Sequence, residues 1–237
     1  MKKLLPILFI SVIAISCNEK VQLAGETIHK NISVENFTAV ENKSSAAIEL
    51  DSSINVGELS ISGDEALVKN VEVENVNGEL KIKNKEPISY RSNNKTVLIK
   101  MNNPDIEKMV ISGAGSIATN DITLKKDIEF HISGAGEVNV KLFNNRTSIF
   151  VAGAGTIRLR GSSDELKVKM TGAGNLEADE LKNKWADVEI SGAGNAKINT
   201  SDELNVKISG VGNLEYKNYD QLKVVKKISG IGTINPY

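Results

Sequence analysis

A heptapeptide of the form apolar, small, Gly, x, Gly, x, apolar recurs along the second half of the chain and constrains its fold more than any other feature. Its seven copies begin at Ile111, Ile132, Val151, Met170, Ile190, Ile208 and Ile228. Their first glycines are 18 to 21 residues apart. Self-similarity at a fixed period of this size indicates a solenoid, in which each repeat is one coil that contacts the coils before and after it.

The segments between the motifs alternate between apolar and polar residues. Leu166, Val168 and Met170, for example, are separated by Lys167 and Lys169. A period of two is typical of a β-strand with one buried face. A meander of antiparallel strands would reverse direction at each turn and would lose the register of the motifs. The pattern therefore predicts an all-β fold, a parallel β-helix with about 20 residues per coil and coils about 4.8 Å apart.

The paired glycines of the motif are expected to form a stacked corner, because Gly accepts φ > 0 and allows close approach of another backbone. These structural corner glycines are Gly113, Gly115, Gly134, Gly136, Gly153, Gly155, Gly172, Gly174, Gly192, Gly194, Gly210, Gly212, Gly230 and Gly232. The residue after each second glycine is mostly polar, as at Asn175, Asn195 and Asn213. In a β-helix these side chains would align and hydrogen-bond from coil to coil.

Residues 30–110 lack the motif but remain strand-like, and no helix with a convincing apolar stripe is evident. Asn77-Gly78 is a candidate turn, and the segment from Tyr90 to Lys95 is the best candidate loop. We expect one domain over residues 30–237, with irregular strands in 30–110 and seven regular coils in 111–237. The irregular part would form either irregular first coils or a sheet that caps the regular ones, because an open end of a β-helix exposes a strand edge.

The N-terminus has the features of an export signal. Lys2 and Lys3 precede an apolar run, and Ala14-Ile15-Ser16 leads to Cys17, the only cysteine of the chain. This segment resembles a bacterial lipoprotein signal, and the resemblance implies cleavage after residue 16 and a lipid on Cys17. Residues 17–29 would form a tether. The alternatives are a plain secretory signal with an incidental Cys17, or an uncleaved anchor, for which the run is short.

Composition excludes several classes of function. The formal net charge is −1, which disfavours nucleic acid as a partner. One cysteine and two histidines give no disulfide framework, no zinc site and no catalytic triad. The Gly-Ala-Gly sequence lacks the third glycine and the following helix of a dinucleotide site. We therefore expect no cofactor and no metal.

A polysaccharide lyase or glycoside hydrolase is the enzymatic alternative, because two suitably spaced carboxylates on a β-helix can perform that chemistry. The acidic pairs Asp164-Glu165, Asp179-Glu180 and Asp202-Glu203 recur mostly just before strands. Lys184 occupies the position between Asp164 and Asp202 on the intervening coil, so adjacent coils do not build an acidic pair. Surface charge is the preferred interpretation, with no catalytic residue and with non-catalytic binding as the function.

Binding of carbohydrate without catalysis would require exposed aromatic side chains. Tyr90, Phe143, Trp185 and Tyr219 fall in connecting segments, whereas Phe130 and Tyr216 share the register of the core. Trp185 is the best single candidate for a ligand-binding residue. The alternative is that its side chain folds back over the core.

The leader, the strand-rich N-terminal half and the serial Ile-Ser-Gly-Ala-Gly motifs together resemble the family called putative auto-transporter adhesin, head GIN domain, from exported proteins of Gram-negative bacteria. The resemblance covers about residues 33–235. It implies a right-handed parallel β-helix and an adhesin, and it supplies no catalytic residues. We thus expect a lipid-anchored protein of the cell envelope, at the outer membrane, that binds a glycan or an envelope or matrix protein. Which face of that membrane it occupies, and its oligomeric state, stay open.

Overall fold

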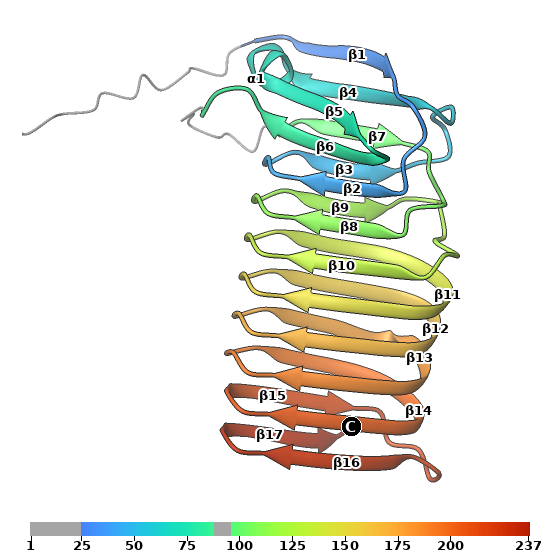
Figure 1. The fold of residues 1–237 in the computed structure, drawn as a ribbon, viewed down its shortest axis with the longest axis vertical. Coiled ribbons are helices and arrows are strands. Elements are labelled where there is room, and N and C mark those ends of the chain that lie inside the picture. The colour runs from blue at the N-terminus through green and yellow to red at the C-terminus, as the bar shows by residue number, and fades with distance from the viewer. Residues whose placement is uncertain (1–24, 88–95) are drawn as a thin grey trace, which may run out of the picture.

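The computed structural model describes residues 25–87 and 96–237, and in these ranges the chain forms one elongated β-solenoid with a cap at its N-terminal end (Figure 1). All 17 strands belong to a single coiled sheet. The expected all-β fold with stacked parallel coils is confirmed. Cys17 and Tyr90 lie outside the described residues, so the structure adds nothing on either.

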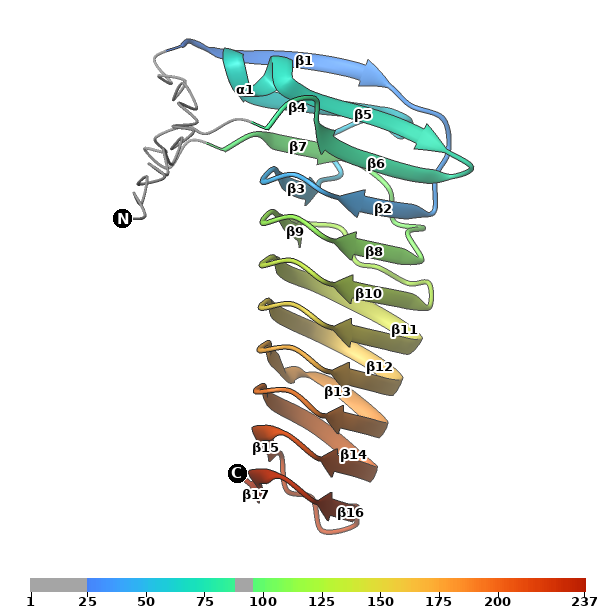
Figure 2. The same cartoon turned by 60° about the vertical axis from the view of Figure 1, so that its left-hand side comes forward.

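The regular coils stack in parallel register along the long axis (Figures 1 and 2). Val168 pairs with Val188, and Val188 pairs with Val206, so equivalent residues form columns. The strands are β8 (Lys108–Ile111), β9 (Ser116–Thr119), β10 (Ile128–Ile132), β11 (Glu137–Val151), β12 (Thr156–Met170), β13 (Asn175–Ile190), β14 (Asn195–Ile208), β15 (Val211–Tyr216), β16 (Lys223–Ile228) and β17 (Ile231–Pro236).

Each regular coil has two narrow edges. The glycine motifs form one, called here the turn edge. The other, called here the bend edge, consists of residues 143–146, 161–165, 181–185, 199–203 and 217–222. The inward columns between the edges are apolar and buried, and they include Phe130 and Tyr216 as predicted. On the turn edge, Asn195 donates to Asn175 and Asn213 donates to Asn195, which confirms the expected ladder.

The stack begins before the first motif. β2 (Ala39–Asn42) pairs in parallel with β8, and β3 (Ala47–Leu50) pairs in parallel with β9. This coil has no glycine at the turn edge. Instead, the buried Asn42 side chain donates to the Ala46 carbonyl and accepts from the backbone N–H and the hydroxyl of Ser44. A side-chain network here holds the turn where the later coils have glycine.

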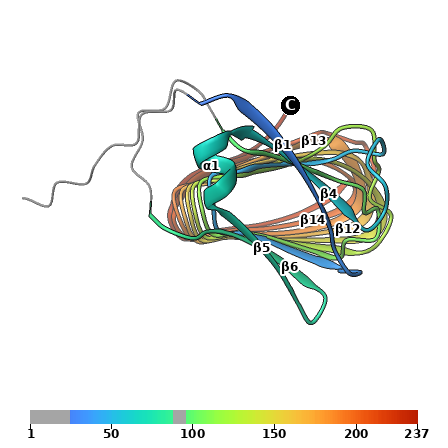
Figure 3. The same ribbon diagram turned by 90° about the horizontal axis from the view of Figure 1, so that it is seen from above.

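The cap is a mixed sheet that curls over this coil (Figures 2 and 3). β1 (Thr27–Ser33), β4 (Glu58–Asp64) and β7 (Leu98–Met101) are antiparallel neighbours, and β5 (Val71–Val76) and β6 (Glu79–Asn84) form a hairpin. Asn77 and Gly78, at its tip, have φ of 53° and 80°. Both positive angles fit a type I′ turn, so the predicted turn is confirmed.

The sequence shows no helix with a convincing apolar stripe, and the described residues contain one short helix. Helix α1 (Glu65–Asn70) follows β4, and the Asp64 side chain caps it by accepting from the backbone N–H of Ala66. Only Leu67 and Val68 of this six-residue helix are buried. A single apolar pair is too short to display a helical period, so the sequence pattern carried no signal.

Of the two reasons expected for the motif glycines, the structure supports close approach of another backbone and not a positive φ. None of the fourteen has φ in the left-handed region; the glycines that do, in the described residues, are Gly57, Gly63, Gly78 and Gly161. A Cβ on Gly192 would instead overlap the carbonyl oxygen of Gly172, directly beneath it in the preceding coil. That carbonyl accepts the Ala193 N–H at 3.1 Å. The turns stack backbone on backbone, and a side chain at these positions has no room.

Candidate functional site

The outward face of the regular coils is covered by ion pairs that run along the axis. Arg158 on β12 contacts Glu137 on the coil before it and, at 2.7 Å, Glu177 on the coil after it. These carboxylates raise the pKa of the Arg158 guanidinium. Lys207 and Glu189 form a similar pair at 2.7 Å. Such exposed pairs fix the charge pattern of the wall but contribute little to stability.

The acidic residues considered for catalysis are spread along the bend edge. Asp164 forms an ion pair with Lys184 at 2.9 Å. Asp202 accepts from the Ser201 hydroxyl at 3.1 Å, and Glu203 accepts from the Asn205 amide at 3.0 Å. Across residues 25–87 and 96–237, no group of three His, Cys, Asp or Glu side chains is placed to hold a metal ion.

The aromatic candidates of the bend edge differ in exposure. Trp185 is 49% exposed and Phe143 is 54% exposed. The Lys184 ammonium lies 5.8 Å from the centre of the Trp185 ring. Tyr219 is half-buried and its hydroxyl donates to Asn199 at 2.7 Å. The structure thus places Phe143 and Trp185 in solvent at the bend edge, on different coils, and gives Tyr219 a local partner.

A second aromatic feature lies on the broad wall beside the turn edge. Val110 on β8, His131 on β10 and Phe150 on β11 are outward neighbours in register on three successive coils. We call these three residues the aromatic stripe, after the rings of His131 and Phe150. The rings of His131 and Phe150 stack with centroids 4.7 Å apart and planes 21° apart. Glu129 lies 3.1 Å from Nε2 of His131 and holds the ring from one side.

The aromatic stripe borders a shallow depression of about 350 Å³. Its lining combines the two rings with hydroxyls and one cation: His131, Ile132, Ser133, Phe150, Val151, Ala152, Lys169 and Thr171. Lys169 forms no ion pair within 4 Å among the residues that the structure describes, but it is the register neighbour of Glu189, whose pKa is lowered mainly by Lys207 and also by the charge of Lys169. An apolar ring face beside hydroxyl and ammonium donors is an arrangement that can hold a polar ligand against the wall.

Sequence reasoning missed Phe150 because it sought aromatic residues only in connecting segments. The signal was present in the alternation itself. Ile149 and Val151 are inward and buried, so Phe150 between them had to face outward. A large aromatic residue at an outward position of a strand is the pattern that would have found the stripe.

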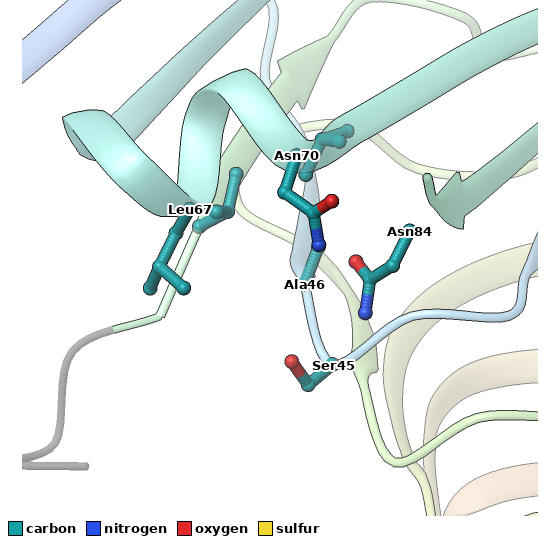
Figure 4. A pocket seen from close by; sticks show the side chains of 7 residues that line it. Ser45, Ala46, Leu67, Asn70 and Asn84 are labelled. Carbon is teal, nitrogen blue, oxygen red and sulfur yellow. The ribbon is translucent and has the colours of Figure 1, made fainter. Parts of the chain in front are cut away.

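Helix α1 covers a small hollow between the cap and the first coil (Figure 4). Leu67 and Asn70 of the helix face Ser45 and Ala46 of the turn and Asn84 of β6. The hollow is about 10 Å³, which is room for about one water molecule. Asn70 also pairs with the backbone of Glu86 through both its amide nitrogen and its oxygen. This hollow is a small packing gap between the cap and the first coil.

A larger groove, of about 430 Å³, lies where the cap meets the coils on the side of the bend edge. Asn102 and Asn103 line it, and their amides donate to the carbonyls of Ile54 and Phe37 at 2.9 and 2.7 Å. Both donors therefore hold the connecting loops. The aromatic stripe, whose polar neighbours include the Lys169 ammonium, is the better candidate site.

Comparisons with known proteins agree with this fold. The family model for the putative auto-transporter adhesin, head GIN domain, matches residues 15–219. A solved putative adhesin from Bacteroides fragilis NCTC 9343 is similar with a TM-score of 0.81 at 19% identity, covering 92% of this chain and 100% of its own. A putative adhesin from Parabacteroides distasonis ATCC 8503 has a TM-score of 0.66 at 19% identity, and the match covers 92% of this chain and 100% of that one.

A third solved structure, described as a putative lipid binding protein from Parabacteroides distasonis ATCC 8503, has a TM-score of 0.65 at 19% identity, covering 92% of this chain and 100% of its own. No curated protein matches the chain. No helix of the described ranges is long and apolar enough to cross a bilayer. Because the family model spans most of the sequence, the chain belongs to the putative auto-transporter adhesin, head GIN domain family, whose name implies exported, envelope-associated proteins.

Proposed function

We propose that this protein is a non-catalytic binding module of the cell envelope, which holds a glycan or an envelope or matrix protein against the wall beside its turn edge. The observation that carries the proposal is the aromatic stripe. It places two stacked rings beside the Lys169 ammonium and the hydroxyls of Ser133 and Thr171. A rigid wall with one chemically distinct patch suits binding, because the patch is held in place by the backbone columns beneath it.

The enzymatic alternative, a β-helical polysaccharide lyase or glycoside hydrolase, receives less support. Such catalysis requires two carboxylates that flank one bond. Asp164 forms an ion pair with Lys184. Asp202 accepts a hydrogen bond from Ser201, and Glu203 accepts one from Asn205. The depression at the stripe contains no carboxylate among its lining residues.

The module is anchored, in this proposal, through a lipid on Cys17 at the outer membrane, after removal of residues 1–16. The support is the leader of the sequence. Replacing Cys17 with Ser should remove the acyl mass from the N-terminus and release the protein from membranes. An unchanged membrane fraction together with an unmodified N-terminus in the wild type would contradict the anchor.

The binding test is an array of glycans and matrix proteins probed with the chain from Gly25 onward, which contains every strand and all of the buried core that the structure describes. Phe150→Ala should weaken binding by about tenfold or more, since aromatic anchors dominate such contacts. Phe143→Ala is the matched control, because Phe143 is exposed on the same strand but at the bend edge. It should bind as the wild type does.

Two results would contradict the assignment. Loss of binding in Trp185→Ala with full binding in Phe150→Ala would move the site to the bend edge. Turnover of any polysaccharide that is abolished by Asp202→Asn or Glu203→Gln would make the protein an enzyme. Circular dichroism of each variant verifies that the fold is retained. The description of one relative as lipid binding adds a lipid surface as a second class of partner.

A further inference from the structure

The last coil, made of β16 and β17, leaves apolar side chains exposed at the C-terminal end of the solenoid. Val224, Lys226 and Ile228 are in register with Leu204, Val206 and Ile208 on the coil before. Those three are buried, whereas Ile228 is 45% exposed and Lys226 is exposed. The inward positions of the last coil therefore form part of an open end face (Figure 1).

The turn edge changes in the same place. The middle residue of the glycine motif is Ala in the first five copies, at Ala114, Ala135, Ala154, Ala173 and Ala193. In the last two copies it is Val211 and Ile231, which pair with each other and are 58% and 77% exposed. Because Ala satisfies the turn elsewhere, the larger side chains are not required by the fold. Together with Ile228 they form an exposed aliphatic corner.

The last two strands carry an excess of positive charge. Residues 221–237 contain Lys223, Lys226 and Lys227 and no Asp or Glu, and the exposed Asp220 directly precedes them, whereas the whole chain has a net charge of −1. Lys227 is next to Ile228 and forms no ion pair among the described residues. Lys223 lies 4.0 Å from Glu203, the outer limit of an ion pair. Lys226 Nζ donates to the Ile234 carbonyl at 3.0 Å and lies 4.9 Å from the centre of the Tyr216 ring.

We propose that this C-terminal end is a docking surface for an anionic lipid bilayer. The aliphatic corner would enter the interfacial region, and the lysines would lie among acidic headgroups, the combination that peripheral membrane contacts use. A second copy of the chain fits less well. Stacking two such ends would bring lysines against lysines and bury Lys226, and an inward-pointing lysine at a strand edge opposes that pairing. The proposal stands on this end alone and is independent of the aromatic stripe.

The position of the surface suits such a contact. β1 and the first described residues lie at the opposite end of the long axis from β16 and β17 (Figures 1 and 2). The cap covers that opposite end and leaves the last coil free. The solenoid would therefore contact the lipid surface with its C-terminal end, which is the end farthest from β1.

The test is co-sedimentation of the chain from Gly25 onward with vesicles. Vesicles of phosphatidylglycerol and phosphatidylethanolamine should bind the protein, and vesicles of phosphatidylcholine alone should not. Lys223→Gln combined with Lys227→Gln should weaken binding by about 25-fold, at about fivefold per lysine. Lys141→Gln combined with Lys182→Gln is the control, because it removes two exposed lysines from central coils and should have no effect.

The apolar contribution is tested by Val211→Ala combined with Ile231→Ala. This variant restores the residue found in the other five copies, so the fold is retained, and vesicle binding should fall several-fold. Equal binding to both kinds of vesicle, no binding to either, or unchanged binding in the end variants would overturn the proposal. So would a concentration-dependent dimer that these variants dissociate. The same variants should bind the glycan and matrix-protein array normally, which separates this surface from the wall.

Discussion

The regular coils and the N-terminal cap solve the same problem, covering a β core, by different means. In the coils every turn repeats the contacts of the previous one, as in the column of Val168, Val188 and Val206. In the cap each contact occurs once, between strands distant in sequence, as where β4 meets β1 and β7 in antiparallel register. Repetition makes the coils depend on backbone stacking, whereas the cap depends on individual side chains.

The largest expected loss of stability comes from substituting a motif glycine, compared here with a glycine of the cap. Gly192→Ala places a Cβ against the Gly172 carbonyl in the middle of the stack, so the backbones of neighbouring coils must move apart. We expect a loss of about 3 kcal/mol or more of unfolding free energy. Gly78→Ala in the cap meets nothing within 4 Å and suffers only from its positive φ of 80°. It should cost about 1 kcal/mol.

Denaturant titrations of the two variants check this ranking. The same substitution at Gly232 in the last copy should cost less than at Gly192, because only one coil adjoins it. Equal midpoints for the wild type and Gly192→Ala would show that the stack does not depend on its glycines.

A smaller effect tests a single contact between the cap and the first coil. Asp51 is buried after β3, and its carboxylate accepts from Lys100 Nζ at 2.8 Å and from the Ser53 N–H at 2.9 Å. These bonds, first of all the one from Lys100, hold the pKa of Asp51 well below its ordinary value of 3.8. A lowered pKa stabilises the fold above the unfolded value and loses that contribution as the pH falls toward the folded value.

Asp51→Asn should therefore cost about 2 kcal/mol at neutral pH and leave the stability of the variant less dependent on pH below about 4. Unfolding midpoints measured from about pH 2 to 7 provide the comparison. If the wild type and the variant lose stability in parallel over that range, Asp51 is not the group responsible.

The smallest effect belongs to the walls of the coils. Arg158→Ala removes an exposed link between three coils, and its effect on the unfolding midpoint should be less than that of Asp51→Asn. The difference should disappear in about 1 M salt, where exposed charges are screened. A larger loss than in Asp51→Asn, or one that persists in salt, would mean that the ladder of ion pairs holds the coils together.

The sequence predicted the part of the fold that repeats. The alternation and the motif spacing located the coils, the inward residues Phe130 and Tyr216, and the Asn ladder, because each signal occurs several times. The hairpin at Asn77-Gly78 was found from one strong local signal. Irregular first coils were one of the two possibilities for residues 30–110, but the coil of residues 39–50 could not be located, because Asn42 and Ser44 replace its glycines with a network that no pattern encodes.

The candidate site was less accessible from the sequence than the fold. The four aromatic residues considered were chosen from connecting segments, and the structure places Phe143 and Trp185 in solvent on different coils. His131 and Phe150 are adjacent because β10 and β11 are in register. Each directly precedes a copy of the motif, so the repeat also indicates this pairing, but aromatic residues were sought only in connecting segments.

The direction of the backbone hydrogen bonds has a mechanical consequence. The coils are joined by bonds that run along the long axis, such as the bond from Ala193 N–H to the Gly172 carbonyl. A force that pulls the two ends of the solenoid apart would act along these hydrogen bonds and would break them one coil after another. Each released coil of about 20 residues would add about 65 Å of extended chain. Under tension the molecule would lengthen in equal steps from its uncapped end, which would keep the force on the remaining coils low.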